Sequence, residues 1–339
     1  MDSAVIDDRV QVTFFLITYN QEKYVREAIE GAFSQTYSPL EIVISDDCST
    51  DGTFRIIEEM SAKYDGPHKV VVNRNSENLG LIGHINRINS LSSGELIVYA
   101  AGDDISLPYR TEKVVERYLA SGRKASLIHS PVFLIDIAGN RSGMRLPPMV
   151  SRGLSLEEMA VSSALIIGAT SAFTKRIEER FGPIRYDKCI EDLVMGFRSA
   201  LTGGLEYIPE PLILYRHESG ITARSDFRFQ SCDDSVRREI RNQEIYLAVL
   251  SQRMDDLVRL GETGLLPLLQ SRRRAALLRR KVWTRHYRFF RLASYAARRG
   301  LLVHFFKSVL REKKWRLFFP LKKLMHTRSV GQLISPTPG

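Results

Sequence analysis

Long apolar runs are missing from this chain of 339 residues. No stretch approaches the ~18 consecutive apolar residues that a transmembrane helix needs, so we expect no membrane span. The first eight residues are acidic and contain no apolar segment, which predicts that there is no secretory signal. Cysteine is scarce. Cys48, Cys189 and Cys232 show neither metal-ligand spacing nor a disulfide framework, and they indicate a reducing compartment.

Acidic residues are almost missing from the C-terminal fifth of the chain. Residues 271–339 contain 19 Lys and Arg but one acid, Glu312, so this tail has a net charge of +18 and the rest of the chain −8. The asymmetry indicates an anionic partner for the tail, either a membrane surface or a nucleic acid. Apolar residues recur between the arginines at helical spacing, among them Leu278, Val282 and Ala296. That composition is typical of a helix on anionic lipid, so we expect residues 271–325 to bind an anionic membrane surface. The alternative is a helical bundle that packs on the preceding domain.

Apolar, β-rich runs alternate with helical patterns in the first third of the chain, which favours βαβ units and a parallel sheet. The order is less regular after residue 104, and from residue 226 to about residue 325 the pattern is helical. We expect strands at 12–18, 40–45, 69–73, 95–101, 125–137, 165–173, 205–208 and 212–215. We expect helices at 22–33, 53–64, 80–91, 108–119, 156–163 and 189–201, and a mobile loop at 141–152.

Pairs of carboxylates follow two of the expected strands. The apolar run Leu96 to Ala101 ends in Gly102-Asp103-Asp104, and an earlier apolar run, Ile42 to Ser45, ends in Asp46-Asp47. In open α/β sheets, ligands bind outside the carboxyl ends of the strands. Two adjacent carboxylates there are costly unless a cation joins them, and Mg²⁺ holding a diphosphate would do so. A third acidic pair, Glu191-Asp192, makes this interpretation stronger than that of a plain acidic turn.

Six motifs together resemble family 2 glycosyltransferases of the GT-A fold. The resemblance covers about residues 10–222 and implies a Rossmann-like α/β fold with a mostly parallel sheet flanked by helices. We therefore expect a catalytic domain at 1–224 and a basic, all-helical region at 225–339. The motifs are Ile17-Thr-Tyr-Asn20, Ile44 to Thr53, Asn78-Leu-Gly80 with Asn86, Gly94-Glu95, Gly102-Asp-Asp104 and Glu191-Asp192.

The resemblance implies a nucleotide site. Asp47 matches the aspartate that accepts the N3–H of uracil or thymine, and Asp46 is expected to cap the loop. Ile17 and Tyr19 match residues that line the nucleotide pocket, Tyr19 by stacking on the base, unless it is an ordinary loop aromatic. Asn86 resembles a residue that faces the nucleotide, with an exposed helix-surface Asn as the alternative.

A divalent metal, Mg²⁺ or Mn²⁺, is also implied. Asp103 matches the second acid of the family's DXD motif, but Ala101 stands at the position of the first acid. Gly102, between them, is expected to belong to the nucleotide site. Asp104 is the candidate to compensate, unless the metal rests on Asp103, water and the diphosphate. Arg216 could bind phosphate and His217 could bind the metal. The alternative is that both are surface loop residues.

Glu191-Asp192 resembles the family's catalytic pair, with Asp192 as the general base that takes the proton of an acceptor hydroxyl. One base suffices for a direct displacement, which inverts the anomeric carbon. The alternative is a pair of acids that complements a helix dipole.

We therefore expect a metal-dependent, inverting glycosyltransferase that moves one sugar from a UDP- or dTDP-sugar to a glycan or polyprenyl-linked acceptor. The chain has no Gln-x-x-Arg-Trp motif, the mark of processive relatives. Its expected place is the cytoplasmic face of a bacterial inner membrane, as a peripheral protein in surface polysaccharide synthesis. A nucleotidyltransferase would need a Gly-rich, basic loop after the first strand, where Thr18 to Glu22 stand. A nucleic-acid-binding protein led by the tail is the third possibility, although we expect no nucleic-acid partner. The oligomeric state is not predicted.

Overall fold

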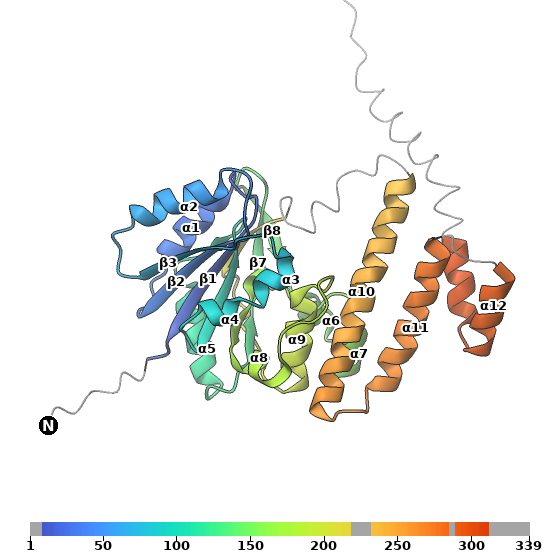
Figure 1. Cartoon of the computed structure of the whole chain (residues 1–339). Helices are drawn as coiled ribbons and strands as arrows, with labels where there is room; N and C mark the ends of the chain where they lie inside the picture. Colours follow the sequence, from blue (N-terminus) through green and yellow to red (C-terminus); the bar gives the residue numbers. More distant parts are fainter. Residues whose placement is uncertain (1–8, 218–231, 285–288, 312–339) are drawn as a thin grey trace, which may run out of the picture. The chain divides into compact units, whose positions relative to one another are not determined.

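The computed structural model describes residues 9–217, 232–284 and 289–311 (Figure 1). The chain forms two compact units. The first comprises Met1–Arg224 and Ala248–Leu266, and the second Ser225–Leu247 and Pro267–Gly339. The sequence placed all of 225–339 in one helical region, whereas in the structure the segment Ala248–Leu266 packs within the first unit.

A central sheet organises the first unit. In the described part of the chain it has seven strands, in the order β10-β6-β9-β4-β1-β2-β3. Strand β9 runs antiparallel to its neighbours β4 and β6, and the other described pairs are parallel. This confirms the expected mostly parallel α/β sheet. The strands are β1 (Val12–Thr18), β2 (Leu40–Asp46), β3 (Lys69–Arg74), β4 (Leu96–Ala101), β6 (Leu127–His129), β9 (Ala172–Thr174) and β10 (Leu205–Tyr207).

The core lies on both faces of this sheet because side chains alternate along each strand. Phe14 and Leu16 of β1 pack on one face with residues of α1 (Val25–Phe33), α2 (Thr53–Ala62) and α5 (Arg110–Ala120). Phe15 points to the other face, where its ring meets that of His84 edge-on. Strands β1 and β2 are buried almost throughout, which explains why both read as continuous apolar runs.

A second, smaller sheet brings the acidic turn after β4 to the end of a distant strand. Among the described residues its order is β5-β11-β7-β8, with bounds β5 (Ile105–Ser106), β11 (Ile213–Arg216), β7 (Val132–Ile135) and β8 (Arg141–Arg145). Strand β11 pairs antiparallel with β5 and parallel with β7. Asp104 directly precedes β5, so it lies beside the end of β11.

Four expected elements differ from the structure. The strand predicted at 125–137 divides into β6 and β7, which join different sheets on either side of Ser130-Pro131, because proline lacks the N–H that a continuous ladder requires. The helix at 80–91 is two helices. The strand at 165–173 is reduced to β9 after a 3-10 turn at Gly168–Thr170, and the loop at 141–152 contains β8 and a short helix.

The remaining helices flank the sheet or form the second unit. Among the helices that the structure describes, none combines the length and apolar character needed to cross a membrane. The remaining helices are α3 (Gly80–Ile85), α4 (Ile88–Leu91), α6 (Pro148–Arg152), α7 (Leu156–Val161), α8 (Arg176–Phe181), α9 (Glu191–Leu201), α10 (Cys232–Leu260), α11 (Leu266–Trp283), α12 (Phe289–Arg298) and residues 302–311.

The second unit has a core of its own. Leu278 and Val282 of α11 pack with Ala296 of α12 and with Phe305 and Val309 of the last described helix. Part of the apolar pattern in the tail is therefore buried inside this unit. Residues 312–325 of the expected membrane-binding segment, including Trp315, lie outside the described residues.

Candidate functional site

Gly102 allows the acidic turn to lie directly against the loop that follows β1. Its N–H donates to the carbonyl oxygen of Ile17 at 2.9 Å. A Cβ at this position would approach the Gln21 Oε1 atom to 2.5 Å and the Thr18 Cγ2 atom to 2.8 Å. The space next to Gly102 is thus already filled by these side chains, so the turn favours glycine.

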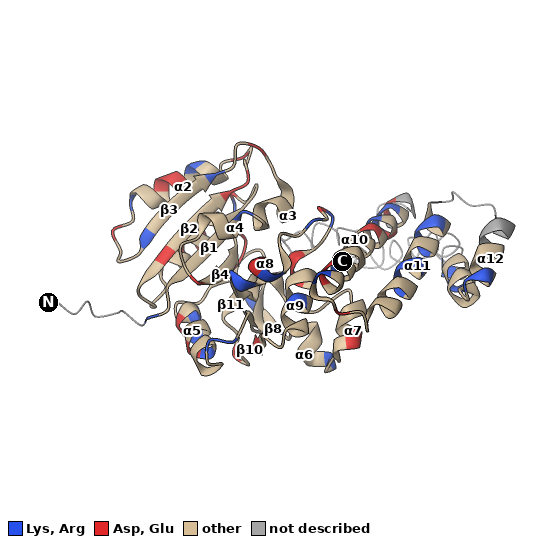
Figure 2. Cartoon of the chain, turned by 60° about the horizontal axis from the view of Figure 1, so that its bottom comes forward, with Lys and Arg blue, Asp and Glu red and all other residues tan. Residues whose placement is uncertain are grey.

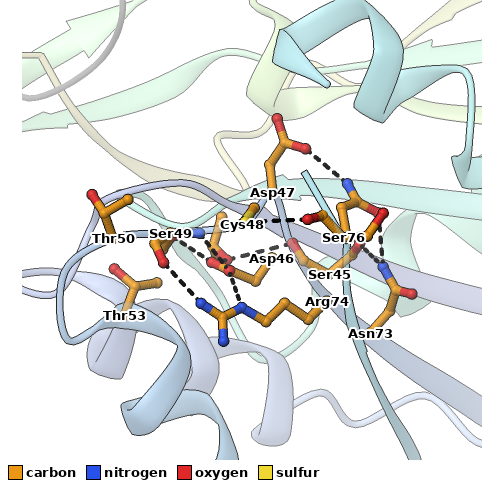
Figure 3. Close-up of polar contacts among 12 residues, drawn as sticks. Ser45, Asp46, Asp47, Cys48, Ser49, Thr50, Thr53, Asn73, Arg74 and Ser76 are labelled. Atoms are coloured by element: carbon orange, nitrogen blue, oxygen red, sulfur yellow. Dashed lines mark hydrogen bonds and ion pairs between the residues drawn. The ribbon is translucent and has the colours of Figure 1, made fainter. Parts of the chain in front are cut away.

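Asp46 and Asp47 end strand β2 and point in different directions (Figure 3). Asp46 is fully buried and accepts hydrogen bonds from the hydroxyl of Thr18 at 3.0 Å and from the backbone N–H and hydroxyl of Ser49 at 2.8 and 2.5 Å. It therefore holds the loop, as predicted. The Oδ1 atom of Asp47 accepts from Asn75 Nδ2 at 2.8 Å and from the Leu79 N–H at 3.0 Å.

The loop after β1 is tied to the loop after β2. The Asn20 N–H donates to the hydroxyl of Ser49 at 2.9 Å, and the Asn20 side-chain oxygen accepts from the Thr50 N–H at 2.9 Å. These bonds place Tyr19 on the same edge of the sheet as Asp47, with 38% of its surface exposed, while Ile17 is half-buried. An exposed aromatic ring beside a carboxylate suits a nucleotide base.

Asn86 has a structural contact that the sequence did not predict. Its Nδ2 atom donates to the Ile184 carbonyl at 2.9 Å, and its Oδ1 atom accepts from the Ile184 N–H at 2.9 Å. The side chain thus binds the backbone a few residues before Glu191. Its contact with a nucleotide stays a prediction.

Asp103 and Asp104 form the acidic turn, and both are almost completely buried. The Oδ1 atom of Asp104 accepts from the Arg216 N–H at 2.9 Å. Burial, together with the charge of Asp103, raises the pKa of Asp104 well above its usual range. A divalent cation fits such a pair, because it would offset two carboxylates that are buried side by side. Among the described residues, no group of three or more His, Cys, Asp or Glu is placed to hold a metal, so this pair would need oxygen ligands from substrate or water.

The buried Arg216 side chain supports the acidic turn. Its Nε atom donates to the Asp103 carbonyl at 3.2 Å, and its Nη2 atom pairs with the Glu27 carboxylate at 3.1 Å. Its Nη1 atom donates to the carbonyls of Asp136 and Ile137. These bonds hold the guanidinium among protein groups, so a phosphate contact is not observed and stays a prediction. The same holds for a metal contact of His217, whose N–H donates to a β7 carbonyl.

Glu191 and Asp192 begin helix α9 and are half-buried. One oxygen of each, Oε2 of Glu191 and Oδ1 of Asp192, receives no hydrogen bond from the described part of the chain. Burial raises the pKa of Glu191, and burial together with the Glu191 charge raises the pKa of Asp192 well above its usual range. Both line a small cavity with Tyr99, Gly168 and other residues.

Tyr99 shows that the structure brings two of the predicted acidic pairs together. Burial raises the pKa of this phenol well above its usual value, and the charges of Glu191, Asp103, Asp104 and Asp192 raise it further. The acids of the turn after β4 and those at the start of α9 therefore act on the same ring, although about 90 residues separate them in the sequence. This proximity is what the proposed chemistry needs.

Sequence reasoning missed two buried arginines near these acids. Arg110 donates to the Tyr99 carbonyl at 2.6 Å and to the Ala169 carbonyl at 3.0 Å. Burial lowers its pKa to about 9, which the charge of Asp104 opposes. Arg253, on the part of α10 that packs in the first unit, donates to the Leu193 carbonyl at 2.7 Å and to the Ala160 carbonyl at 3.0 Å.

A buried ion pair fixes α9 at a further point. Arg198 and Asp256 form two hydrogen bonds of 2.9 Å each, and Arg198 also donates to the Gly182 carbonyl. Arg198 lies on α9 and Asp256 on α10, so the helix that begins with Glu191-Asp192 is held from its first turn to its last. Nothing in the sequence marks these arginines as buried, because their partners are distant.

The chain is similar to proteins of one glycosyltransferase family. Residues 13–180 match the family described as Glycosyl transferase family 2. EpsE of Bacillus subtilis is 28% identical over 227 residues, which cover 67% of this chain and 80% of EpsE. The succinoglycan biosynthesis protein ExoO of Rhizobium meliloti is 29% identical over 213 residues, 61% of this chain and 57% of ExoO.

A solved structure shares the fold. The chain resembles residues 1–349 of S. aureus TarS in complex with UDP-GlcNAc with a TM-score of 0.53 and 15% sequence identity, over 91% of this chain and 92% of the TarS chain. At this identity the likeness concerns the fold.

Proposed function

Because the chain belongs to glycosyltransferase family 2, we propose that it transfers a single sugar from a UDP- or dTDP-sugar to an acceptor hydroxyl, with inversion at the anomeric carbon. The observation that carries this proposal is that Glu191 and Asp192 line one cavity with Tyr99 of β4, the strand that leads into Asp103-Asp104, and that the charges of both acidic pairs raise the pKa of this phenol. One acidic pair suits a metal and diphosphate, and the other suits proton transfer.

The donor would bind at the edge where β1, β2 and β4 end. Asp47 would accept the N3–H of uracil or thymine, since a carboxylate is an acceptor only and cytosine offers no donor at that position. Tyr19 would stack on the base. The TarS structure of the same fold carries UDP-GlcNAc, which supports a UDP-sugar donor.

Asp192 would act as the general base. As the acceptor oxygen bonds to the anomeric carbon, its proton moves to the Asp192 carboxylate and the bond from that carbon to the diphosphate breaks. The raised pKa suits this task, because a base with a pKa near the working pH holds the transferred proton more readily. The neighbouring Glu191 charge contributes to that shift.

A Mg²⁺ or Mn²⁺ ion would be held by Asp103 and Asp104. When bound, it would stabilise negative charge on the diphosphate. Arg216 holds the turn by a hydrogen bond to the Asp103 carbonyl, and Arg110 holds the strand before the turn by a hydrogen bond to the Tyr99 carbonyl.

The setting that fits best is bacterial surface polysaccharide synthesis, with a glycan or polyprenyl-linked acceptor. The name of the relative ExoO supports polysaccharide synthesis. The charge of residues 271–325 supports a peripheral location on an anionic membrane, at its cytoplasmic face. Neither the nucleotidyltransferase nor the nucleic-acid-binding alternative gains support from the site.

The test is a screen of UDP-, dTDP- and GDP-sugars with Mn²⁺, read first as a thermal shift and then as release of nucleoside diphosphate. A bound donor should raise the melting temperature by mass action, and the shift should disappear in Asp47→Ala. If no nucleotide sugar raises the melting temperature or is hydrolysed, the proposed activity is wrong.

A further inference from the structure

The last described helix, residues 302–311, has two apolar faces. Leu301, Phe305 and Val309 point inward and are at most 5% exposed, in the core of the second unit. On the other side, the exposed fractions are 39% for Leu302, 62% for Val303, 49% for Phe306 and 65% for Leu310.

The exposed residues form one continuous row. Leu302, Phe306 and Leu310 are spaced four residues apart, so their side chains lie along the same side of the helix, and Val303 lies beside them. We name these four residues the outer row. A row of large apolar side chains in water is unfavourable, and such patches usually mark an interaction surface.

Cations border the outer row. Lys307 and Arg311 are exposed one helical position further round, and Arg298 and Arg299 are exposed at the end of α12. No acidic residue occurs between Glu262 and Glu312. Figure 2 accordingly shows basic but no acidic positions on α11 and α12. The partner must therefore accept apolar side chains and offer negative charge at their edge.

We propose that the outer row is the membrane-docking face of this chain, and that it inserts into the headgroup region of an anionic bilayer. This deepens the peripheral location given under the proposed function and rests on it. An interfacial helix buries its apolar side ~5–10 Å into the boundary between headgroups and acyl chains, while Lys and Arg stay with the phosphates. Lys307 is placed for that contact, and Arg311 lies one turn further along the helix, 3.9 Å from the carboxylate of Glu239.

Other occupants fit less well. A second copy would bring two surfaces with an excess of Lys and Arg together, and like charges would repel. Residues 312–339 of the same chain are themselves basic, with one acid. A nucleic acid would satisfy the cations but would gain little from Leu302, Val303 and Leu310, because phosphate contacts supply most of such binding.

The experiment is flotation of the full-length protein with vesicles of phosphatidylglycerol and phosphatidylcholine. In the triple variant Leu302→Ser/Phe306→Ser/Leu310→Ser, the partition coefficient should fall at least about tenfold, because three buried apolar side chains are lost. The matched control is Val258→Ser, which removes an apolar side chain of the same exposure as Leu310 from α10 and should float normally.

A charge variant separates the two contributions. Lys307→Gln/Arg311→Gln should lower binding to anionic vesicles about tenfold or more, and it should weaken the salt dependence. Binding to vesicles of phosphatidylcholine alone should not change.

Four results would overturn the proposal. The first two are that the native protein does not float, or that the triple variant floats normally. The third is that the triple variant, without lipid, melts at a temperature well below that of Val258→Ser. The fourth is that the native protein is a dimer and the triple variant a monomer. The last two would mean that protein covers the outer row. Hydrolysis of a UDP-sugar in the same preparations tests the enzyme separately: protein that hydrolyses but does not float overturns only the docking face, and protein that floats without hydrolysis overturns only the activity.

Discussion

Two acidic pairs of the first unit differ in their surroundings: Asp46-Asp47 is buried, whereas Glu191-Asp192 is half-buried with one inaccessible oxygen in each residue. Hydroxyls, backbone N–H groups and an amide donate to the first pair. In the described part of the chain, one oxygen of each acid in the second pair has no donor, and burial raises both pKa values. The first pair is stabilised by the folded protein itself. The second pair is stabilised by a proton or by a donor group that a substrate brings, as a base for an acceptor hydroxyl requires.

The largest effect is expected at the acidic turn, which shares its surroundings with the second pair. Asp103→Ala should raise the activation free energy of transfer by several kcal/mol and so lower the rate about 10⁴-fold, because the metal loses a ligand beside the diphosphate. Calorimetric titration of UDP with and without Mn²⁺ should show that the metal no longer increases affinity. The exposed Asp65→Ala serves as the control. Full metal enhancement in the Asp103 variant would remove this residue from the site.

Asp192→Asn should lower the turnover number by about 10²–10⁴-fold, the usual contribution of a general base. Donor affinity should stay unchanged, because Asp47 and the acidic turn are untouched. Steady-state kinetics and UDP titration check the two parts. A variant with normal turnover would show that Asp192 takes no proton.

The same substitution should change stability in opposite directions at the two pairs. A carboxyl group whose folded pKa is raised stabilises the protein below its unfolded pKa and loses that contribution as the pH rises through the folded pKa. Asp192→Asn should therefore raise the free energy of unfolding at pH 7, by on the order of 1 kcal/mol per unit of pKa shift removed, and should have little effect at pH 4. Asp46→Asn should lower it by about 1–3 kcal/mol, since it weakens the bonds to Thr18 and Ser49.

Denaturant unfolding of both variants at the two pH values measures this contrast. If Asp192→Asn destabilises the protein as much as Asp46→Asn does, the second pair is held by protein groups after all, and the comparison fails.

The smallest effect is a shift in the pH profile. The rate should rise with pH as Asp192 loses its proton, and the Glu191 charge delays that loss. Glu191→Gln should therefore move the acidic limb of kcat to lower pH, by about one unit for a coupled pair. Asp46→Asn should leave the limb in place. A limb that moves to higher pH in Glu191→Gln would contradict the assignment of the base.

The sequence predicted the first four strands of the sheet well, and three of them, β1, β2 and β4, are buried along most of their length. Strand β1 has the bounds expected from its apolar run, and β2, β3 and β4 differ by one residue at an end. A parallel strand covered on both faces must be apolar along its length, so composition is enough to find it. The motifs also placed Asp103 and Glu191-Asp192 in one neighbourhood, as the surroundings of Tyr99 show.

Contacts between distant residues were not predictable from one sequence. Arg110, Arg198 and Arg253 look like surface residues of helices, yet their partners are carbonyls and a carboxylate far along the chain. Likewise, no local pattern says that Asn86 binds Ile184 or that strand 125–137 changes sheets. Such contacts depend on how elements pack, which periodicity does not encode.

The close packing around Gly102 limits which substitutions can become fixed at position 102. A Cβ at this position would approach side-chain atoms of Gln21 and Thr18 to 2.5 and 2.8 Å, so even alanine requires these side chains to shift. Every codon that differs from a glycine codon by one base, unless it is another glycine codon or a stop, encodes a side chain with a Cβ. In a saturation library selected for transfer, position 102 should therefore be enriched in glycine, and other residues should appear mainly together with changes at Gln21 or Thr18.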